Sequence, residues 1–303
     1  MGIRSKVVAA IAAAMIVTPA LAGAASAGGS ADATSRGVAS SDFGRDRLAA
    51  VGLADGGTSL VSFRTDQPSK VKGIGAVSGL DGDAKLVGID HRVQNGKLYG
   101  VGNAGGIYVL STSDAKAGKV GQLSVALSGS AFGVDFNPAA NALRVISDNG
   151  QNLRQPFPAT GDAPTAPTVA DTGLTLPPVA PNPAATATGV SAAAYTNNDL
   201  DATTGTTLFD INTALDQVAI QSPANSGTLV PTGGLGIDAD LDAGFDIYSK
   251  LRGGRTVDVT GFATLTSGGL SALYSVDLLG GAVDRVGKFP MPVTDIAVVL
   301  DQR

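Results

Sequence analysis

The strongest constraint on the fold of this 303-residue chain is a short string that recurs along it. The string is a glycine, an apolar residue and an aspartate at residues 88–90, 133–135 and 244–246, and residues 294–296 (TDI) carry a degenerate copy. Successive aspartates are 45, 111 and 49 residues apart, and residues 190–196 (VSAAAYT) fill the middle of the long step. Five units of about 40 to 55 residues follow, a period typical of four-stranded propeller blades.

Within the units, apolar residues alternate with other residues in short segments that are typical of half-buried strands. These segments are residues 60–63 (LVSF), 98–101 (LYGV), 107–110 (IYVL), 143–146 (LRVI), 208–211 (LFDI) and 273–276 (LYSV). Glycine accounts for 41 residues, about twice its usual ~7 %, and all 26 acidic residues are aspartate. Because unbranched helix formers are scarce, the composition favours an all-β fold joined by tight turns.

The blade boundaries follow from this repeat. Four blades are predicted over residues 86–126, 131–171, 190–236 and 244–289. A fifth is composite, because residues 293–300 contain only a first strand and residues 48–77 contain only later strands. Pairing the two ends would close a ring of about five four-stranded blades and leave no open sheet edge. The alternative is an open β-sandwich or a stack of hairpins with the same local pattern.

Two connections have a distinct composition. Residues 155–189 hold eight of the fifteen prolines, which predicts an irregular excursion with one short edge strand near residues 168–171. Asn149-Gly150 predicts a hairpin turn, since this pair tolerates a positive φ. Residues 197–207 are predicted to form an exposed polar loop.

The N-terminus has the pattern of a secretory signal. Residues 1–27 combine a charged start at Arg4 and Lys6, an apolar stretch over residues 7–17 and a small-x-small site before Gly28; residues 20–22 offer a second site. The apolar stretch is shorter than the ~20 residues of a membrane span, so cleavage is preferred to anchoring. We expect a secreted, extracellular protein with no membrane anchor, a flexible linker over residues 28–45 and a single domain over residues 46–303.

Charge and missing residue types exclude several functions. Without residues 1–27, nineteen basic residues oppose 26 acidic ones, a net charge of −7 that disfavours nucleic acid. There is no cysteine, which excludes disulfides and thiolate metal sites. His91 is the only histidine; it follows Asp90 directly, so their side chains are expected on opposite faces of a strand. We interpret His91 as a surface or strand-end residue, not as a catalytic base.

The repeated aspartates form the first candidate binding site. If each string lies on the innermost strand of its blade, four carboxylates approach the central channel: Asp90, Asp135, Asp246 and Asp295. Converging carboxylates would raise one another's pKa or bind a hard cation such as Ca²⁺. The alternative, which we favour, is that each aspartate accepts backbone N–H bonds from a neighbouring turn and locks adjacent blades together.

Two weaker candidates lie elsewhere. Asp238, Asp240 and Asp242 alternate as in a calcium loop, but Ala243 and Ser249 occupy the positions where the EF-hand pattern needs glycine and glutamate, so a solvated turn is favoured. The polar residues that flank the Asn-Gly turn would suit an acidic ligand or simply lie on solvated strand faces. They are Arg144, Asn152 and Arg154.

Several longer strings resemble a bacterial secreted family known as domain of unknown function 4394. They are residues 133–154 (GVDFNPAANALRVISDNGQNLR), 192–198 (AAAYTNN), 207–211 (TLFDI), 227–229 (GTL), 235–238 (LGID) and 244–247 (GFDI). The resemblance covers nearly all of residues 48–300. It implies a propeller-like, exported protein, and no catalytic residues transfer because the family has no established activity.

These observations predict a non-enzymatic, secreted binding or surface-interaction module. We expect a monomer without a resident cofactor that uses loops around the channel mouth to bind an unknown ligand or surface partner. The alternative function is a calcium-assisted propeller hydrolase with Asp90, Asp135, Asp246 and Asp295 as ligands.

Overall fold

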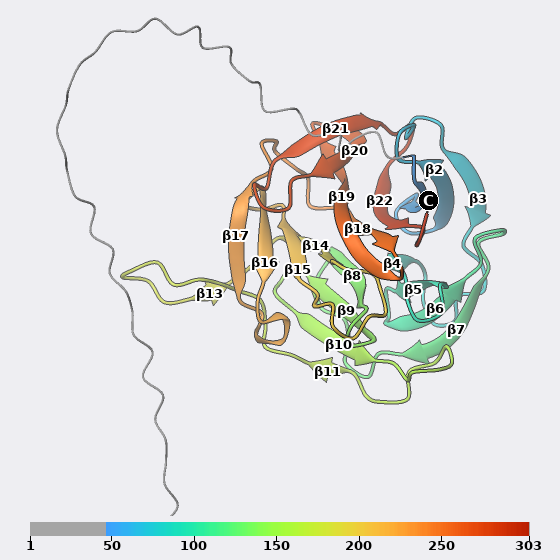
Figure 1. The fold of residues 1–303 in the computed structure, drawn as a ribbon, viewed down its shortest axis with the longest axis horizontal. Coiled ribbons are helices and arrows are strands. Elements are labelled where there is room, and N and C mark those ends of the chain that lie inside the picture. Colours follow the sequence, from blue (N-terminus) through green and yellow to red (C-terminus); the bar gives the residue numbers. More distant parts are fainter. Residues whose placement is uncertain (1–46, 303) are drawn as a thin grey trace, which may run out of the picture. The chain divides into compact units, whose positions relative to one another are not determined.

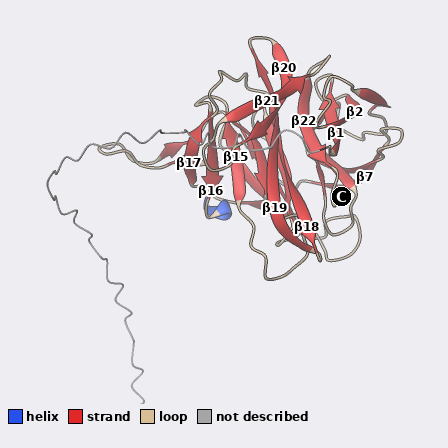
Figure 2. Ribbon diagram, turned by 45° about the horizontal axis from the view of Figure 1, so that its top comes forward, coloured by secondary structure: helices blue, strands red, loops and turns tan. Residues whose placement is uncertain are grey.

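A computed structural model describes residues 47–302, which form five four-stranded antiparallel sheets arranged as the blades of a β-propeller (Figure 1). The predicted signal peptide (residues 1–27) and linker (residues 28–45) lie outside the described residues. Nearly all regular structure in the described part is strand, with one short 3₁₀ turn, η1 (Ala224–Ser226) (Figure 2). No helix within residues 47–302 has the length and apolar character needed to span a membrane.

The blades are numbered from the one that contains both ends of the described residues. Blade 1 consists of β22 (Val293–Val298), β1 (Ala49–Ala54), β2 (Ser59–Arg64) and β3 (Lys72–Ala76), in that order. Blade 2 consists of β4 (Leu86–His91), β5 (Leu98–Gly102), β6 (Gly106–Leu110) and β7 (Ala117–Gln122). Blade 3 consists of β8 (Phe132–Asn137), β9 (Ala142–Ser147), β10 (Asn152–Pro156) and β11 (Val169–Ala170).

The remaining strands follow in sequence order. Blade 4 consists of β14 (Val190–Tyr195), β15 (Leu208–Asn212), β16 (Gln217–Gln221) and β17 (Leu229–Gly234). Blade 5 consists of β18 (Ala243–Arg252), β19 (Arg255–Ser267), β20 (Leu270–Val276) and β21 (Val283–Lys288). A separate two-stranded hairpin, β12 (Thr175–Leu176) and β13 (Ala185–Thr186), lies between blades 3 and 4 in the sequence.

The two ends of the domain share blade 1. Strand β22 pairs antiparallel with β1, so that Asp295 lies opposite Leu53, and Leu53 lies opposite Leu60 of β2. Beyond β22, the Gln302 side chain exchanges two hydrogen bonds with the backbone of Ala49. The predicted closed ring is therefore confirmed, and the open sandwich is wrong.

The first strand of each blade lines the axis. Strands β22, β4, β8, β14 and β18 contact one another in cyclic order (Figure 1). Because they are covered on both sides, most of their residues are buried, as in β14, where all six are buried. The apolar core is divided into five clusters, one between each pair of neighbouring blades. Packing between blades, together with strand pairing, holds the ring.

The glycine of the recurring string permits the inner strands to approach closely. A Cβ atom at Gly133 would lie 2.6 Å from the backbone nitrogen of Ala193 in blade 4. A Cβ atom at Gly244 would lie 2.4 Å from the Cα atom of Asp295 in blade 1. Both obstacles are backbone atoms of the next inner strand, so a side chain at either position would push two blades apart.

We therefore expect Gly133→Ala to lower the free energy of unfolding by about 1–3 kcal/mol, the usual range for overpacking a filled interior. Urea denaturation followed by circular dichroism measures it. The matched control is Gly73→Ala in β3, where a Cβ atom would meet nothing within 4 Å. Equal midpoints for the wild type and Gly133→Ala would show that the close approach does not constrain the fold.

The predicted connections are largely present. The short edge strand expected near residues 168–171 is β11, and Gly150 has a φ of 90° in the turn between β9 and β10. The loop over residues 197–207 is mostly exposed or half-buried, as predicted, but Asp199 is an exception. Asp199 is buried, and its carboxylate accepts a hydrogen bond of 2.8 Å from the backbone nitrogen of Thr256.

Candidate functional site

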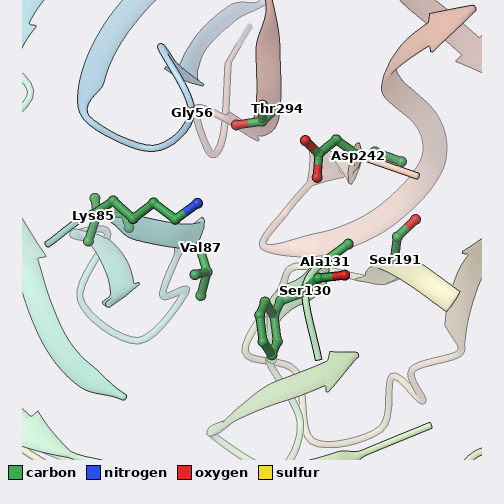
Figure 3. A pocket seen from close by; sticks show the side chains of 11 residues that line it. Gly56, Lys85, Val87, Ser130, Ala131, Ser191, Asp242 and Thr294 are labelled. Carbon is green, nitrogen blue, oxygen red and sulfur yellow. The ribbon is translucent and has the colours of Figure 1, made fainter. Parts of the chain in front are cut away.

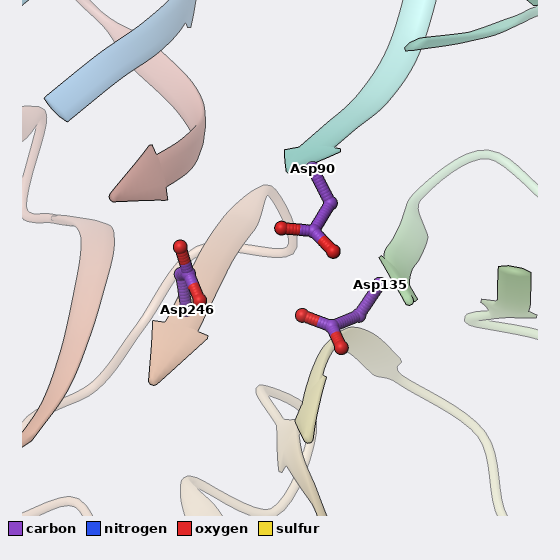
Figure 4. A group of neighbouring side chains, drawn as sticks. All are labelled: Asp90, Asp135 and Asp246. Carbon is purple, nitrogen blue, oxygen red and sulfur yellow. The ribbon is translucent and has the colours of Figure 1, made fainter. Parts of the chain in front are cut away.

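Three carboxylates meet near the axis of the ring. Asp90 lies on β4, Asp135 on β8 and Asp246 on β18, and one oxygen from each lies within 4.8 Å of the others. Figure 4 shows the three side chains directed toward one another from three blades. All three residues are buried. The structure thus brings together three of the four aspartates that the sequence repeat predicted for the channel.

Asp295 does not join this group, because its string is out of register with the others. Asp90 pairs with Tyr99 on the second strand of its blade, whereas the corresponding pair in blade 1 joins Ala297 to Val51. Asp295 therefore lies two positions earlier along its strand. We call the inner-strand position of Asp90, Asp135 and Asp246 the central position. In blade 4 this position is occupied by Ala194, so that this blade also lacks a carboxylate there.

Each aspartate connects its own inner strand to the next one. The carboxylates accept backbone hydrogen bonds from a residue of the following blade: Asp90 from Phe136 (2.7 Å), Asp135 from Tyr195 (3.0 Å), Asp246 from Val298 (2.5 Å) and Asp295 from Ile89 (2.8 Å). The sequence interpretation expected donors in turns, but all four donors lie in strands. The aspartates thus link neighbouring blades directly.

Burial and mutual repulsion determine the protonation of this site. Burial raises the pKa of Asp90 well above its ordinary value, and the Asp246 carboxylate raises it further. Burial and the Asp90 carboxylate likewise raise the pKa of Asp135. Burial raises the pKa of Asp246 to about 6, against the opposing effect of the Val298 N–H. Three charges this close are unfavourable in a buried site, so the group holds protons or a cation.

The spacing fits a hard cation. Calcium binds oxygen at ~2.4 Å, so two of its ligands are at most ~4.8 Å apart, and one oxygen from each of the three carboxylates lies within 4.8 Å of the others. One oxygen of Asp246, Oδ1, is buried and has no hydrogen-bond partner within residues 47–302. Asp90, Asp135 and Asp246 could therefore hold Ca²⁺, with water or carbonyl oxygens completing the six to eight ligands it prefers.

The alternating aspartates at residues 238–242 form no such group. Asp238, Asp240 and Asp242 are exposed in the connection between β17 and β18. Within the described residues, the central aspartates are the only three or more acidic or histidine side chains spaced to share a metal ion. This placement agrees with a solvated turn.

A small cavity opens where the inner strands begin. Its volume is about 50 Å³, and its lining includes Lys85, Asp242, Ser130, Ser191 and Thr294 (Figure 3). The space is sufficient for a few water molecules but not for an organic ligand. Sequence reasoning did not single out Lys85, and it considered Asp242 only as part of a calcium loop, although each directly precedes an inner strand.

One residue of each second strand faces the neighbouring blade, and its type differs from blade to blade. This residue lies opposite the central position of the inner strand, and in blades 1 to 5 it is Val51, Tyr99, Arg144, Phe209 and Phe262. The three aromatic residues pack against the next blade; for example, the rings of Tyr99 and Phe136 are 5.2 Å apart in an edge-to-face arrangement. Blades 1 and 3 carry no aromatic residue there, and each is bordered by a groove.

The groove between blades 1 and 2 contains His91. Its volume is about 630 Å³, and Val51 and Phe63 contribute to its apolar lining. His91 is the last residue of β4, as a strand-end interpretation expected, but it is buried and not on the surface. Burial lowers the pKa of His91 to about 4, partly opposed by the backbone of Gly96, so the ring is neutral at neutral pH.

The groove between blades 3 and 4 contains a buried arginine. Arg144 on β9 is 2 % exposed. Its Nη1 donates to Asn152 (2.7 Å) and Asp171 (2.8 Å), its Nη2 to Asn225 (2.7 Å) and its Nε to the Tyr195 hydroxyl (3.3 Å). The solvated strand face considered for Arg144 and Asn152 is therefore wrong, because both side chains lie in a buried polar network.

A second arginine completes this network at the groove surface. Arg154 on β10 donates from Nε and Nη2 to the two oxygens of Asp171 (3.0 and 3.1 Å), and its side chain is 29 % exposed. The groove has a volume of about 380 Å³. Gln221 on β16 also lines it, and the Oε1 atom of this buried residue has no hydrogen-bond partner within residues 47–302.

Sequence reasoning singled out Arg144, Asn152 and Arg154 but missed their partners. Asp171 comes from the proline-rich segment and Asn225 from η1, and neither position belongs to a repeated pattern. The missed signal was the second-strand position itself, where an arginine replaces an aromatic residue.

Several solved structures are similar to this chain. They include an auxiliary nutrient binding protein from Bacteroides thetaiotaomicron (13 % identity, 61 % of this chain and 47 % of that chain, TM-score 0.39). They also include a protein from Lactobacillus plantarum (16 % identity, 80 % of this chain and 82 % of that chain, TM-score 0.39). The Dos1 propeller is a third (10 % identity, 74 % of this chain and 53 % of that chain, TM-score 0.36). The chain thus spans about half of the nutrient binding protein.

No curated protein matches this sequence. A family model described as Domain of unknown function (DUF4394) matches residues 59–297, from β2 to the penultimate residue of β22. The match includes the central aspartates and both arginines of the groove between blades 3 and 4. The chain therefore belongs to the DUF4394 family.

Proposed function

We propose that the protein is an exported, non-enzymatic binding module whose ligand occupies the groove between blades 3 and 4. The observation that carries this proposal is the burial of Arg144 at a position where blades 2, 4 and 5 have an aromatic residue. Buried charges are often no more stable than apolar packing of the same volume. An arginine network beside an open groove is therefore better explained by recognition than by stability.

Two observations support a role without catalysis. One oxygen of each of Asp90, Asp135 and Asp246 already accepts a backbone hydrogen bond from the next blade, and these residues are buried. His91, the only imidazole, lines the separate groove between blades 1 and 2. We propose that the module acts outside the cell as a monomer, without nucleic acid, membrane anchor or resident cofactor, on grounds of its leader sequence, net charge and composition.

The second candidate function is a calcium-assisted hydrolase. It is favoured by one observation, the 4.8 Å grouping of Asp90, Asp135 and Asp246, which fits Ca²⁺. A Ca²⁺ ion held by the three carboxylates would lower the pKa of a water molecule bound to it and so supply a nucleophile for hydrolysis.

One experiment separates the two candidates. The mature protein is screened by thermal shift against amino acids, sugars and organic acids, in calcium and in chelator, and each ligand that raises the melting temperature is tested for chemical change. We expect ligand-dependent stabilisation, unchanged ligand and equal melting temperatures in calcium and chelator. Conversion of the ligand, or activity that requires calcium, would reject the binding module in favour of the hydrolase; a screen without any stabilising ligand would reject it as well.

A further inference from the structure

We infer that the groove between blades 3 and 4 binds a small hydroxylated carboxylate of the sugar-acid class, held by Arg154 and oriented by Gln221 and Tyr195. This inference rests on the proposed binding function and names its ligand class. It follows from the charge of the groove, its unmatched polar atoms and its size.

The charge of the groove calls for an anion. Arg144 and Arg154 contribute two positive charges, and Asp171, which bonds to both, contributes one negative charge. The further carboxylate that the charge of Arg144 reaches, Asp210, is buried, and burial raises its pKa, which favours its neutral form. With Asp210 neutral, one positive charge remains. The Nη1 atom of Arg154 donates to no described residue, whereas Nε and Nη2 are held by Asp171. A carboxylate matches such a fixed guanidinium through short, charge-assisted hydrogen bonds.

The unmatched atoms call for hydroxyl groups on the ligand. The Oε1 atom of Gln221 is a buried acceptor without a donor, while its Nε2 is tied to the carbonyl of Ala224. The Tyr195 hydroxyl has two side-chain hydrogen-bond partners, Arg144 and Asn137. With both as donors, its own proton remains for a ligand acceptor. An anion with acceptors only would leave Gln221 unpaired, and an unpaired buried acceptor weakens binding. A hydroxylated anion satisfies both residues.

The size of the groove limits the ligand to one small ring or chain. Its volume of about 380 Å³ is near the lower end of the ~300–1,000 Å³ typical of small-molecule sites. Ile220 and Pro223 add apolar lining beside the polar atoms. This combination suits the C–H faces and hydroxyl edges of a sugar.

A purely structural role explains only part of the network. Hydrogen bonds from Arg144 to Asn152, Asp171 and Asn225 tie the outer part of blade 3 to η1. These hydrogen bonds do not involve the Nη1 atom of Arg154 or the Oε1 atom of Gln221. Both atoms are left available to a ligand. We assign Arg144 as a positioning residue and Arg154 and Gln221 as ligand contacts.

The experiment is a titration of the mature protein with glucuronate, glucose and cyclohexanecarboxylate, followed by ligand-observed NMR. These probes carry the carboxylate with hydroxyls, the hydroxyls alone and the carboxylate alone. We expect glucuronate to bind most tightly, and its affinity to fall as sodium chloride is added. Arg154→Gln should weaken glucuronate binding about 10- to 100-fold, the range for a hydrogen bond to a charged group, and leave glucose nearly unchanged.

Two further variants keep the test decisive. Gln221→Leu should weaken glucuronate but not cyclohexanecarboxylate, because only the former presents hydroxyls. The matched control is Arg64→Gln, since Arg64 lies on the third strand of blade 1 and also pairs with an aspartate, Asp66. Melting temperatures of all variants verify folding. If Arg154→Gln fails to fold, it is replaced by Arg154→Lys, which keeps the charge and should retain part of the affinity for glucuronate.

The outcomes separate this inference from the proposed function. If glucose binds as tightly as glucuronate, or Arg154→Gln binds glucuronate like the wild type, the sugar-acid class is wrong. Absence of glucuronate binding overturns the inference too, while a different ligand found in the broad thermal-shift screen would still support a binding module. If that screen also finds no ligand, both proposals fail.

Discussion

A chain that ends at Pro292, before β22, is expected to lose its cooperative unfolding transition. The truncation removes Val293, Ile296 and Val298, each at most 3 % exposed, and leaves β1 without its inner neighbour. Burial of three such side chains contributes about 5–9 kcal/mol, comparable with the whole stability of a typical domain of ~5–15 kcal/mol. Differential scanning calorimetry measures the transition.

The control shortens the chain elsewhere. Replacing the eight residues 177–184, the exposed tip of the β12–β13 hairpin, by Asn-Gly also shortens the chain, without touching the ring. This variant should melt within a few degrees of the wild type. A truncated chain that still melts cooperatively near the wild-type temperature would mean that four blades are stable without closure.

Asp246→Asn should make the protein more stable at pH 8 and reduce the dependence of its stability on pH. Burial raises the pKa of Asp246 from 3.8 to about 6. A raised pKa means that the folded state binds the proton more tightly, so this stabilisation is present below pH ~4 and is lost as the pH rises through 6. The shift corresponds, at 1.36 kcal/mol per pKa unit, to about 3 kcal/mol, or roughly 6–12 °C in melting temperature for a domain of this size.

Asparagine retains an oxygen to accept the hydrogen bond from Val298 and removes one of the three neighbouring charges. Melting temperatures of the wild type and the variant from pH 4 to pH 8, in chelator, give the result. Asp238→Asn, at an exposed position outside the group, is the control and should follow the wild type. Parallel curves for wild type and Asp246→Asn would refute the buried, proton-binding state. Destabilisation of the variant that appears only in calcium would instead indicate a resident cation.

The ring could be predicted because its determinants are local and repeated. The glycines of the strings allow the next blade to approach closely, with backbone atoms as the neighbours at Gly133 and Gly244 and the Val134 side chain at Gly88. Closure was predictable because residues 293–300 contain only the first strand of a blade and residues 48–77 contain only the later strands. Register was less accessible: in the degenerate string at residues 294–296 the aspartate stands two positions early, so that Ala297, opposite Val51, and not Asp295 occupies the central position.

The polar groove was only partly predictable because its partners come from irregular segments. Arg144 and Arg154 belong to strands and appear in the alternating pattern. Asp171 and Asn225 belong to a proline-rich excursion and a 3₁₀ turn, whose paths depend on tertiary packing. A pattern specifies which face a strand residue occupies, but not which distant loop covers it.

The shared first blade also orders events during synthesis. Strands β1 to β3 emerge before the other described strands, whereas their inner partner β22 emerges after all of them, and Ala49 and Gln302 are hydrogen-bonded across 253 positions. Blades 2 to 5 are each contiguous in sequence and can assemble as they appear. The N-terminal sheet must wait with one unprotected edge until β22 has been made, so the ring closes only after blades 2 to 5 have been synthesised.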